Sequence, residues 1–422
     1  MPPPSEPGAA ERGLKAFSGK RSELVALLGA FSFLLSAIEF TFPKPLPFVR
    51  LGIANLPLLL AVDLLPLPSY LLLATVKFVG MSLVSGTLFS YVALFSAAGS
   101  FASALAMWLA RRLGGRAISH LGVSVTGAML SSAAQIALAR ALIFGDAALY
   151  IAPLFFASSL LTGSLLGLFA SRFVASSRWY ARHASGTGPP LDATTISPPG
   201  AEVGSASRSS ERGRLLRQAR AEGWDRRFAP APLAVTAACV ALSLLFQPNI
   251  WFRALVVLLL AFAVRLSGRR IGPLATLVVT LSIVLANLVV PVGRLLFRIG
   301  PLLVTATALV EGLAKALAFQ GLIFASKAGI RPALRFPGRI GALVSEAFAG
   351  YQSLLESGGK LRPGRFVEDT DALLLGLEAR AAGAALGEAG AAEPERRGVA
   401  TELFVVIGSS LALLGAGLLL RA

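Results

Sequence analysis

Four polar side chains stand in or beside the first apolar stretches of the sequence, where charges are costly. They are Glu39, Arg50, Asn55 and Lys77. Lys77 lies near the middle of the apolar run 69–86, and an unpaired charge there would be unfavourable in a membrane. An ion pair with Glu39 or Asp63, snorkelling toward an interface, or contact with a ligand would relieve this cost. We therefore treat these four residues as candidates for substrate binding.

Arg50 and Asn55 belong to the segment 41–57, T-F-P-K-P-L-P-F-V-R-L-G-I-A-N-L-P. Prolines interrupt helices, and the segment joins two strongly apolar runs. Its polar groups need partners, because an unsatisfied polar group in hydrocarbon costs several kcal/mol. The segment predicts a re-entrant or lid-like loop over a small-molecule site.

Small residues recur on the first apolar run. Ala26 and Ala30 are four residues apart with Gly29 beside them, so they predict a flat strip that another helix can approach closely. Ordinary internal packing is the alternative.

Glu311 and Lys315 in the second half are also four residues apart. This spacing predicts a structural ion pair on one helix face, and a proton or ion path is the other interpretation.

Other kinds of chemistry have few candidate residues. The one cysteine, Cys239, lies in an apolar run, and His120 and His183 have no nearby carboxylate cluster, so we predict no disulfide, metal site or cofactor. The sequence has no G-x-x-x-x-G-K-[ST] motif for ATP and no D-D-x-x-D motif for diphosphate and magnesium. We expect no enzyme activity in the chain itself.

Membrane helices must position these residues. Of 422 residues, 55% are hydrophobic and only 14% are charged, and the mean hydropathy is +0.72; soluble domains have about 25% charged residues. The net charge of +17 comes from basic residues placed mostly between apolar runs, which is typical of the positive-inside pattern and argues against nucleic-acid binding. We predict an all-α, multi-pass protein of the bacterial inner membrane.

About 11 transmembrane helices are expected, six in the first half and five in the second. The runs are 24–40, 51–65, 69–86, 87–110, 121–143, 149–173, 231–246, 251–266, 271–292, 301–325 and 403–420. With this count the basic clusters near residues 15–21, 111–116 and 172–182 share one side, which the positive-inside rule makes cytoplasmic, together with the N-terminus. Arg294 and Arg298 would lie on the opposite side.

Composition divides the chain into two membrane domains. We predict a cytoplasmic tail at 1–20, a first membrane domain at 21–176, a linker rich in Ser, Gly, Pro and Arg at 177–228, and a second membrane domain at 229–422. The linker has too little apolar area to fold alone. Within the second domain, residues 327–400 predict a cytoplasmic region whose amphipathic helices, near 337–357 and 369–386, could transmit force to a partner.

The motif R-L-G-I-A-N, Arg50 to Asn55, after a proline-rich loop resembles the Gx transporter family. That family is also named heptaprenyl diphosphate synthase component I and is similar to the substrate-binding S components of energy-coupling-factor (ECF) transporters. The resemblance covers residues 21–182. It implies that Ala26 and Ala30, which match an A-x-x-x-A docking pattern on the first helix, contact a transmembrane T component.

The second half is similar to such a T component in its order of four helices, a coupling region and a last helix. Arg362 and Arg380 lie in partial counterparts of the motifs that dock on the ATPases. The resemblance implies uptake of a small organic nutrient with separate ABC-type ATPase subunits as partners.

Two other functions are considered. One is a membrane subunit of prenyl (heptaprenyl) diphosphate synthesis, and the other is a secondary transporter in which an ion gradient acts through Glu311 and Lys77.

Overall fold

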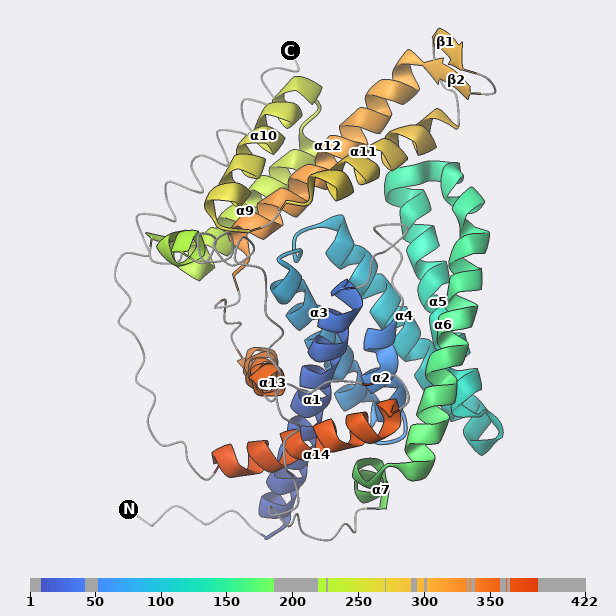
Figure 1. Cartoon of the computed structure of the whole chain (residues 1–422), viewed down its shortest axis with the longest axis vertical. Helices are drawn as coiled ribbons and strands as arrows, with labels where there is room; N and C mark the ends of the chain where they lie inside the picture. The colour runs from blue at the N-terminus through green and yellow to red at the C-terminus, as the bar shows by residue number, and fades with distance from the viewer. Residues whose placement is uncertain are drawn as a thin grey trace.

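The computed structural model describes residues 9–41, 52–185, 219–224, 227–269, 271–289, 294–299, 302–331, 334, 338–356, 362 and 365–385. These residues are almost entirely helical, as predicted, with one two-stranded hairpin as the exception. Figure 1 shows a lower group of helices, α1 to α7, and an upper group, α9 to α12, that runs obliquely across its top. Arg50, most of the predicted linker and the predicted last helix lie outside the described residues.

The lower group contains all helices of the first half. They are α1 (Ala9–Thr41), η1 (Ile53–Asn55), α2 (Leu56–Ala61), α3 (Leu67–Ser85), α4 (Tyr91–Gly114), η2 (Gly115–Ala117), α5 (His120–Ala139), η3 (Arg140–Phe144), η4 (Gly145–Ala147), α6 (Ala148–Ser176) and α7 (Arg178–Ser185). The largest buried side chains of α1, α2 and α3 form one hydrophobic core, which helices of the second half complete.

The run 51–65 does not form the crossing helix that the sequence predicts. Gly52 adopts a left-handed backbone with φ 75°, a conformation that favours glycine, and the chain then forms only η1 and the six-residue α2. Every residue of α2 is buried. The run is therefore a half-length helix inside the bundle, since the proline-rich segment precedes it and Pro66 starts the next helix.

Within the described residues, five stretches are long and apolar enough to cross a membrane. They are Arg21–Glu39, Leu67–Ser85, Tyr91–Gly114, His120–Ser176 and Ala306–Gly329. The 57-residue stretch His120–Ser176 contains both α5 and α6, joined by the turn at Gly145. The described helices are thus those of a membrane protein.

The second half contributes α9 (Pro230–Phe246), α10 (Ile250–Leu266), α11 (Pro273–Leu288), β1 (Leu295–Ile299), β2 (Leu302–Thr305), α12 (Ala306–Gly329), α13 (Gly338–Glu356) and α14 (Phe366–Ala385). Glycines let α12 approach its neighbours closely: Gly321 lies against Leu244 of α9, and Gly312 lies against the backbone of Val284 of α11. The hairpin β1–β2, which the sequence does not predict, fills the connection between α11 and α12 and carries Arg298.

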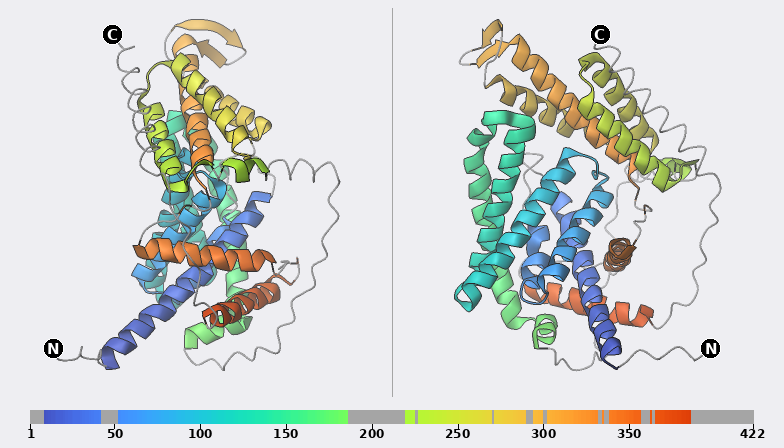
Figure 2. Two further views of the ribbon diagram at one scale, coloured as in Figure 1. Left: turned by 90° about the vertical axis from the view of Figure 1, so that its left-hand side faces the viewer. Right: turned by 180° about the vertical axis from the view of Figure 1, so that it is seen from behind.

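The two amphipathic helices end up against the first half of the chain. The predicted ranges 337–357 and 369–386 correspond to α13 and α14, and α14 begins three residues earlier than predicted. α13 lies against α1 and α3, while α14 crosses α1, α6 and α7 (Figures 1 and 2). The ring of Phe33 on α1 is 5.0 Å from that of Phe348 and 6.3 Å from that of Tyr351 on α13. These contacts join the two halves.

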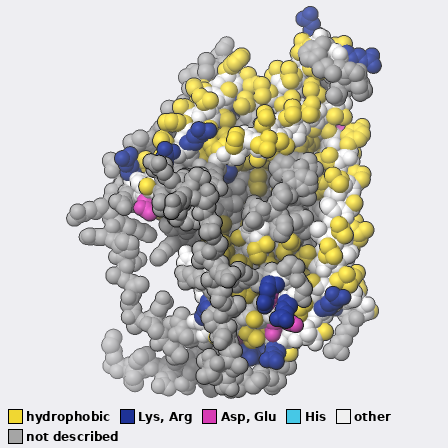
Figure 3. Space-filling model, in the orientation of Figure 1, with side chains coloured by type: hydrophobic (Ala, Val, Ile, Leu, Met, Phe, Trp, Pro, Cys, Tyr) yellow, Lys and Arg dark blue, Asp and Glu magenta, His cyan; other side chains and the backbone are white. Residues whose placement is uncertain are grey.

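Basic residues gather where α1 begins and where α4 and α6 end, and we call this the basic end of the lower group. Its members include Arg21, Arg111, Arg112, Arg172, Arg178 and Arg182. Figure 3 shows Lys and Arg side chains over the lower part of the molecule, below a mostly hydrophobic surface. This grouping matches the common side that the positive-inside pattern predicts for the three clusters.

Gly80 of α3 lies against the ring of Phe33 on α1, which in turn packs on Phe348 of α13, so a substitution at Gly80 tests this packing. A Cβ on Gly80 would lie 1.9 Å from Cζ of Phe33, so Gly80→Ala should displace the ring and lower the free energy of unfolding by about 1–3 kcal/mol. The midpoint of thermal unfolding in detergent measures this loss. Gly376→Ala on α14 is the matched control, because no atom lies within 4 Å of its added Cβ. Equal midpoints for Gly80→Ala and the parent would contradict the packing.

Candidate functional site

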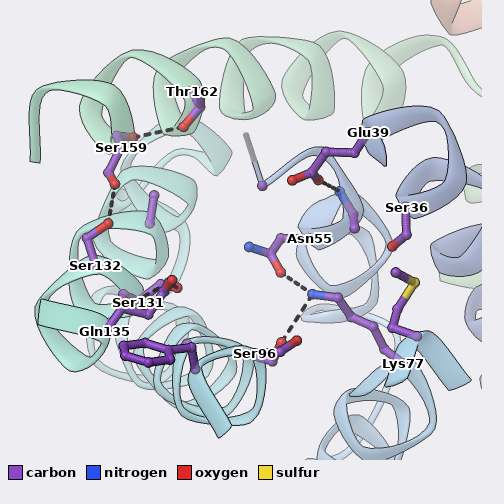
Figure 4. A pocket seen from close by; sticks show the side chains of 17 residues that line it. Ser36, Glu39, Asn55, Lys77, Ser96, Ser131, Ser132, Gln135, Ser159 and Thr162 are labelled. Carbon is purple, nitrogen blue, oxygen red and sulfur yellow. Dashed lines mark hydrogen bonds between the residues drawn. The ribbon is translucent and has the colours of Figure 1, made fainter. Parts of the chain in front are cut away.

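A polar cavity lies inside the lower group, between α1, η1, α3, α4, α5 and α6 (Figure 4). It encloses about 750 Å³ of empty space, its open mouth included. Eleven of its 17 lining residues have polar side chains, in a bundle whose helices are otherwise strongly apolar. Polar groups inside membrane bundles are costly and usually serve function, which makes this cavity the candidate site.

Three of the four predicted substrate-binding residues meet on one wall of this cavity. Lys77 of α3 donates hydrogen bonds to the side-chain oxygen of Asn55 and, over 3.5 Å, to the hydroxyl of Ser100. Glu39 of α1 accepts a hydrogen bond of 3.4 Å from the backbone N–H of Ala54. Lys77 is 6% exposed and Glu39 is 5% exposed, so both charged groups are buried. Arg50, the fourth, lies outside the described residues.

The opposite wall consists of hydroxyl and amide groups that the sequence analysis did not single out. Ser132 of α5 and Ser159 of α6 share a hydrogen bond, and Gln135 donates to the hydroxyl of Ser131 over 3.0 Å. Gly99 of α4 leaves room for this wall, because a Cβ there would lie 2.7 Å from Nε2 of Gln135. The serines at three- and four-residue spacing along α4 and α5 were the signal available in the sequence.

Ser36 of α1 provides a hydroxyl that is ready for a further partner. It lines the cavity and is 2% exposed, and its Oγ has no hydrogen-bond partner within the described part of the chain. A buried hydroxyl without a partner costs about 1–3 kcal/mol. A bound molecule that hydrogen-bonds Ser36 would remove this cost.

Asp63, one of the two acidic partners considered for Lys77, belongs instead to an ion-pair cluster at the basic end. Its carboxylate lies 2.7 Å from Nε of Arg111 on α4 and 3.1 Å from Nε2 of His120 on α5. Burial would raise the pKa of the Asp63 carboxyl, but the hydrogen bond from His120 and the charge of Arg111 together lower it. Burial and the charge of Asp63 raise the pKa of the nearby Tyr180 phenol.

Ala26 and Ala30, the predicted docking residues, are buried on α1. A Cβ on Gly350 of α13 would lie 3.0 Å from Cβ of Ala30, so small residues on both helices allow this close approach. The docking surface thus faces a helix of the same chain. That this surface contacts a T component stays a prediction.

The two predicted coupling arginines hold the ends of α14 in place. Arg362 bonds Asp369 over 2.8 Å, and this hydrogen bond lowers the pKa of the Asp369 carboxyl. Arg380 donates to the backbone oxygen of Ser353 on α13 over 2.9 Å. Both side chains also lie on the exposed surface. Their contact with an ATPase remains a prediction.

The remaining candidates lie outside the cavity. Glu311 and Lys315 on α12 are 4.0 Å apart, and Lys315 also donates to Asn287 of α11 over 2.7 Å, which fits the predicted structural pair. His183 lies against the ring of Trp179. Within the described ranges, no group of three or more His, Cys, Asp and Glu side chains could hold a metal ion.

The Asp63 cluster predicts a pH-dependent stability. Because the folded-state pKa of Asp63 is lowered, its stabilising contribution is present at neutral pH and is lost as the pH falls through that lowered value. We expect Asp63→Asn to reduce the free energy of unfolding at pH 7 by about 1–2 kcal/mol. Thermal unfolding across pH should show this difference shrinking below about pH 4.

Asp146→Asn is the matched control for this measurement. Asp146 pairs with Arg140 over 2.7 Å, but the two side chains are 66% and 55% exposed, so the exchange should change stability little. A difference between Asp63→Asn and the parent that stays constant down to pH 3 would contradict the assignment.

Two parts of the chain match family models. Residues 28–173, which include the whole cavity, match the family described as heptaprenyl diphosphate synthase component I. Residues 233–331, from α9 to α12, match a family described as a domain of unknown function (DUF8519). No curated protein and no solved structure matches the chain. The resemblance predicted for the first half is thus confirmed at the level of this family model, and the likeness of the second half to a T component stays a prediction.

Proposed function

We propose that this chain binds a small polar organic nutrient in the cavity and takes it up as the membrane part of an ECF-type transporter. The first half binds the substrate, and the second half links it to separate ABC-type ATPase subunits. The observation that carries this proposal is the buried polar cavity, in which Lys77, Glu39 and Ser36 line one space inside an apolar bundle. The hydroxyl of Ser36 has no hydrogen-bond partner among the described residues.

The helix bundle would be more stable without this cavity. Lys77 could be replaced by an apolar residue at no loss of packing, and the half-length α2 could be a complete crossing helix. Half-helices that begin within the membrane are a recurrent way of placing backbone dipoles at a substrate site. A ligand that contacts the buried Lys77 and the start of the half-length α2 would offset the free-energy cost of both features.

The charges of the cavity favour a substrate with little net charge. Among the described lining residues, one ammonium group, on Lys77, and one carboxylate, on Glu39, line the same wall, so the charges of these two sum to zero. A zwitterion or a neutral molecule with hydroxyl, amide or heterocyclic nitrogen groups would satisfy both charges and the serine wall. A multiply charged anion would meet the buried Glu39 carboxylate at a large electrostatic cost.

Contacts between the halves support a coupling role for α13. Phe33 packs on α13, and Ser36 and Glu39 follow it on α1 by three and six residues, facing the cavity. A shift of α13 would therefore move the helix that carries two cavity residues. We place the basic end at the cytoplasmic face of a bacterial membrane on the positive-inside rule. The proposal then puts α14, which packs on α6 and α7 near that end, on the side where ATPases would bind.

The description of the matching family, heptaprenyl diphosphate synthase component I, favours a second candidate, a membrane subunit that assists prenyl diphosphate synthesis. A diphosphate normally needs several cationic groups or bound magnesium, and the cavity offers one lysine beside a carboxylate. The ion-gradient alternative has less support, because Glu311 is 59% exposed on α12 and pairs with Lys315.

Exchanging Lys77 tests the substrate site. We expect Lys77→Met to reduce uptake of the nutrient into cells or vesicles at least tenfold, because the ligand loses a charge partner and Asn55 loses its hydrogen bond. Lys315→Met on α12 is the matched control, since it also removes one lysine from a membrane helix but lies outside the cavity. Comparable uptake by Lys77→Met and the parent would contradict the assignment.

An affinity pull-down of the tagged chain from native membranes tests the partner. We expect one or two ATP-binding-cassette subunits in the eluate by mass spectrometry, with measurable ATPase activity. Recovery of a prenyl synthase in their place would favour the second candidate, and recovery of no ATPase from intact complexes would contradict an ECF mechanism.

A further inference from the structure

A second, smaller cavity lies beneath the first on the way to the basic end. It encloses about 290 Å³ and shares Gly52, Asn55, Ala128 and Thr162 with the main cavity. Its remaining lining adds two buried hydroxyls, Ser103 of α4 and Ser124 of α5. Since four residues border both spaces, the two cavities adjoin within the lower group.

Three helices present a continuous file of residues from the main cavity through the inner cavity. On α4 the file is Ser96, Ser100, Ser103 and Met107, and on α5, in the opposite chain direction, it is Gln135, Ser131, Ala128 and Ser124. The segment of η1 and the half-length α2 contributes Asn55 from η1 and Leu59 from α2. Spacings of three and four residues keep each set on one helix face.

The next residue of each file belongs to the Asp63 cluster. Arg111 follows Met107 by four residues on α4, and His120 precedes Ser124 by four on α5. Asp63, which pairs with both, lies in the turn just beyond the end of α2. One helical turn rises about 5.4 Å, so the inner cavity and this ion-pair cluster are separated by a single layer of side chains. That layer contains Leu59 and Met107, which are 1% and 2% exposed.

Met107 is suited to open and close this layer. A Cβ on Gly127 would lie 2.5 Å from Cγ of Met107, so the side chain rests in a space that the glycine leaves on α5. Methionine is unbranched and changes rotamer readily. Its movement would join the inner cavity to the surface at Asp63.

We propose that the inner cavity is a second binding station on an exit route for the substrate, and that the Asp63–Arg111–His120 cluster is the latch that closes this route at the basic end. The station takes the same class of ligand as the main cavity, a small uncharged or zwitterionic molecule that hydrogen-bonds serine hydroxyls. The class of ligand rests on the proposed function, but the route and the latch can be tested without any substrate.

Cysteine accessibility in the full-length chain provides the test. Cys239, the one cysteine, is replaced by serine, and Ser124 is replaced by cysteine so that a thiol reports on the inner cavity. The probe is the membrane-impermeant cation 2-(trimethylammonium)ethyl methanethiosulfonate, added to inverted membrane vesicles. We expect slow modification with Asp63 present and modification at least tenfold faster with Asp63→Asn.

Two controls separate an opened latch from general loosening. Asp146→Asn breaks a carboxylate–arginine pair at the opposite end of α5 and should leave the Ser124→Cys rate unchanged. Ala74→Cys reports on a fully buried position of α3 outside the route and should stay unreactive with Asp63→Asn. Unchanged modification of Ser124→Cys with Asp63→Asn, equal acceleration by Asp146→Asn, or reaction at Ala74→Cys would each overturn the proposal.

The outcome is independent of the uptake experiment. If Lys77→Met abolishes uptake while Asp63→Asn fails to expose Ser124→Cys, the substrate site stands and the exit route is wrong. If Asp63→Asn opens the route while Lys77→Met leaves uptake intact, the latch stands and the substrate site has to be reassigned.

Discussion

The hydrogen bond between the Lys77 ammonium and the Asn55 side chain is the interaction on which the lower group depends. A buried lysine inside a membrane bundle requires a polar partner, and no apolar neighbour can supply one. Asn55 can reach it because η1 begins inside the bundle, immediately after the left-handed Gly52. The broken helix, the buried charge and the polar cavity are therefore parts of one arrangement.

A second constraint joins this arrangement to the other half of the chain. The face of α1 around Gly29, Ala30 and Phe33 packs on α13, while Ser36 and Glu39 of the same helix line the cavity. One helix thus connects the contact with α13 directly to the wall of the cavity. It requires no long pathway of side chains between the site and the coupling helices.

The cavity and the ion-pair cluster divide the lower group along its length. Hydroxyl groups surround the middle, the apolar pair Leu59 and Met107 forms the layer beneath it, and charged groups cover the basic end. Such an order suits a solute that must leave water, pass a low-dielectric layer and return to water. The thinnest part of this series of layers is the single apolar layer, whose thickness is about one helical turn.

Composition and periodicity alone determined the membrane class, most helix positions and the amphipathic nature of α13, because these follow from local patterns of apolar residues. They also singled out Glu39, Asn55 and Lys77, because charges in apolar runs are conspicuous. Only the tertiary structure decided that Asp63 pairs with Arg111 and not with Lys77, since that choice depends on where α2 ends relative to α4. It also revealed the wall of hydroxyl and amide groups, whose residues come from α5 and α6 and are individually ordinary. The half-length α2, whose sequence is apolar enough for a full crossing helix, likewise appeared only in the structure.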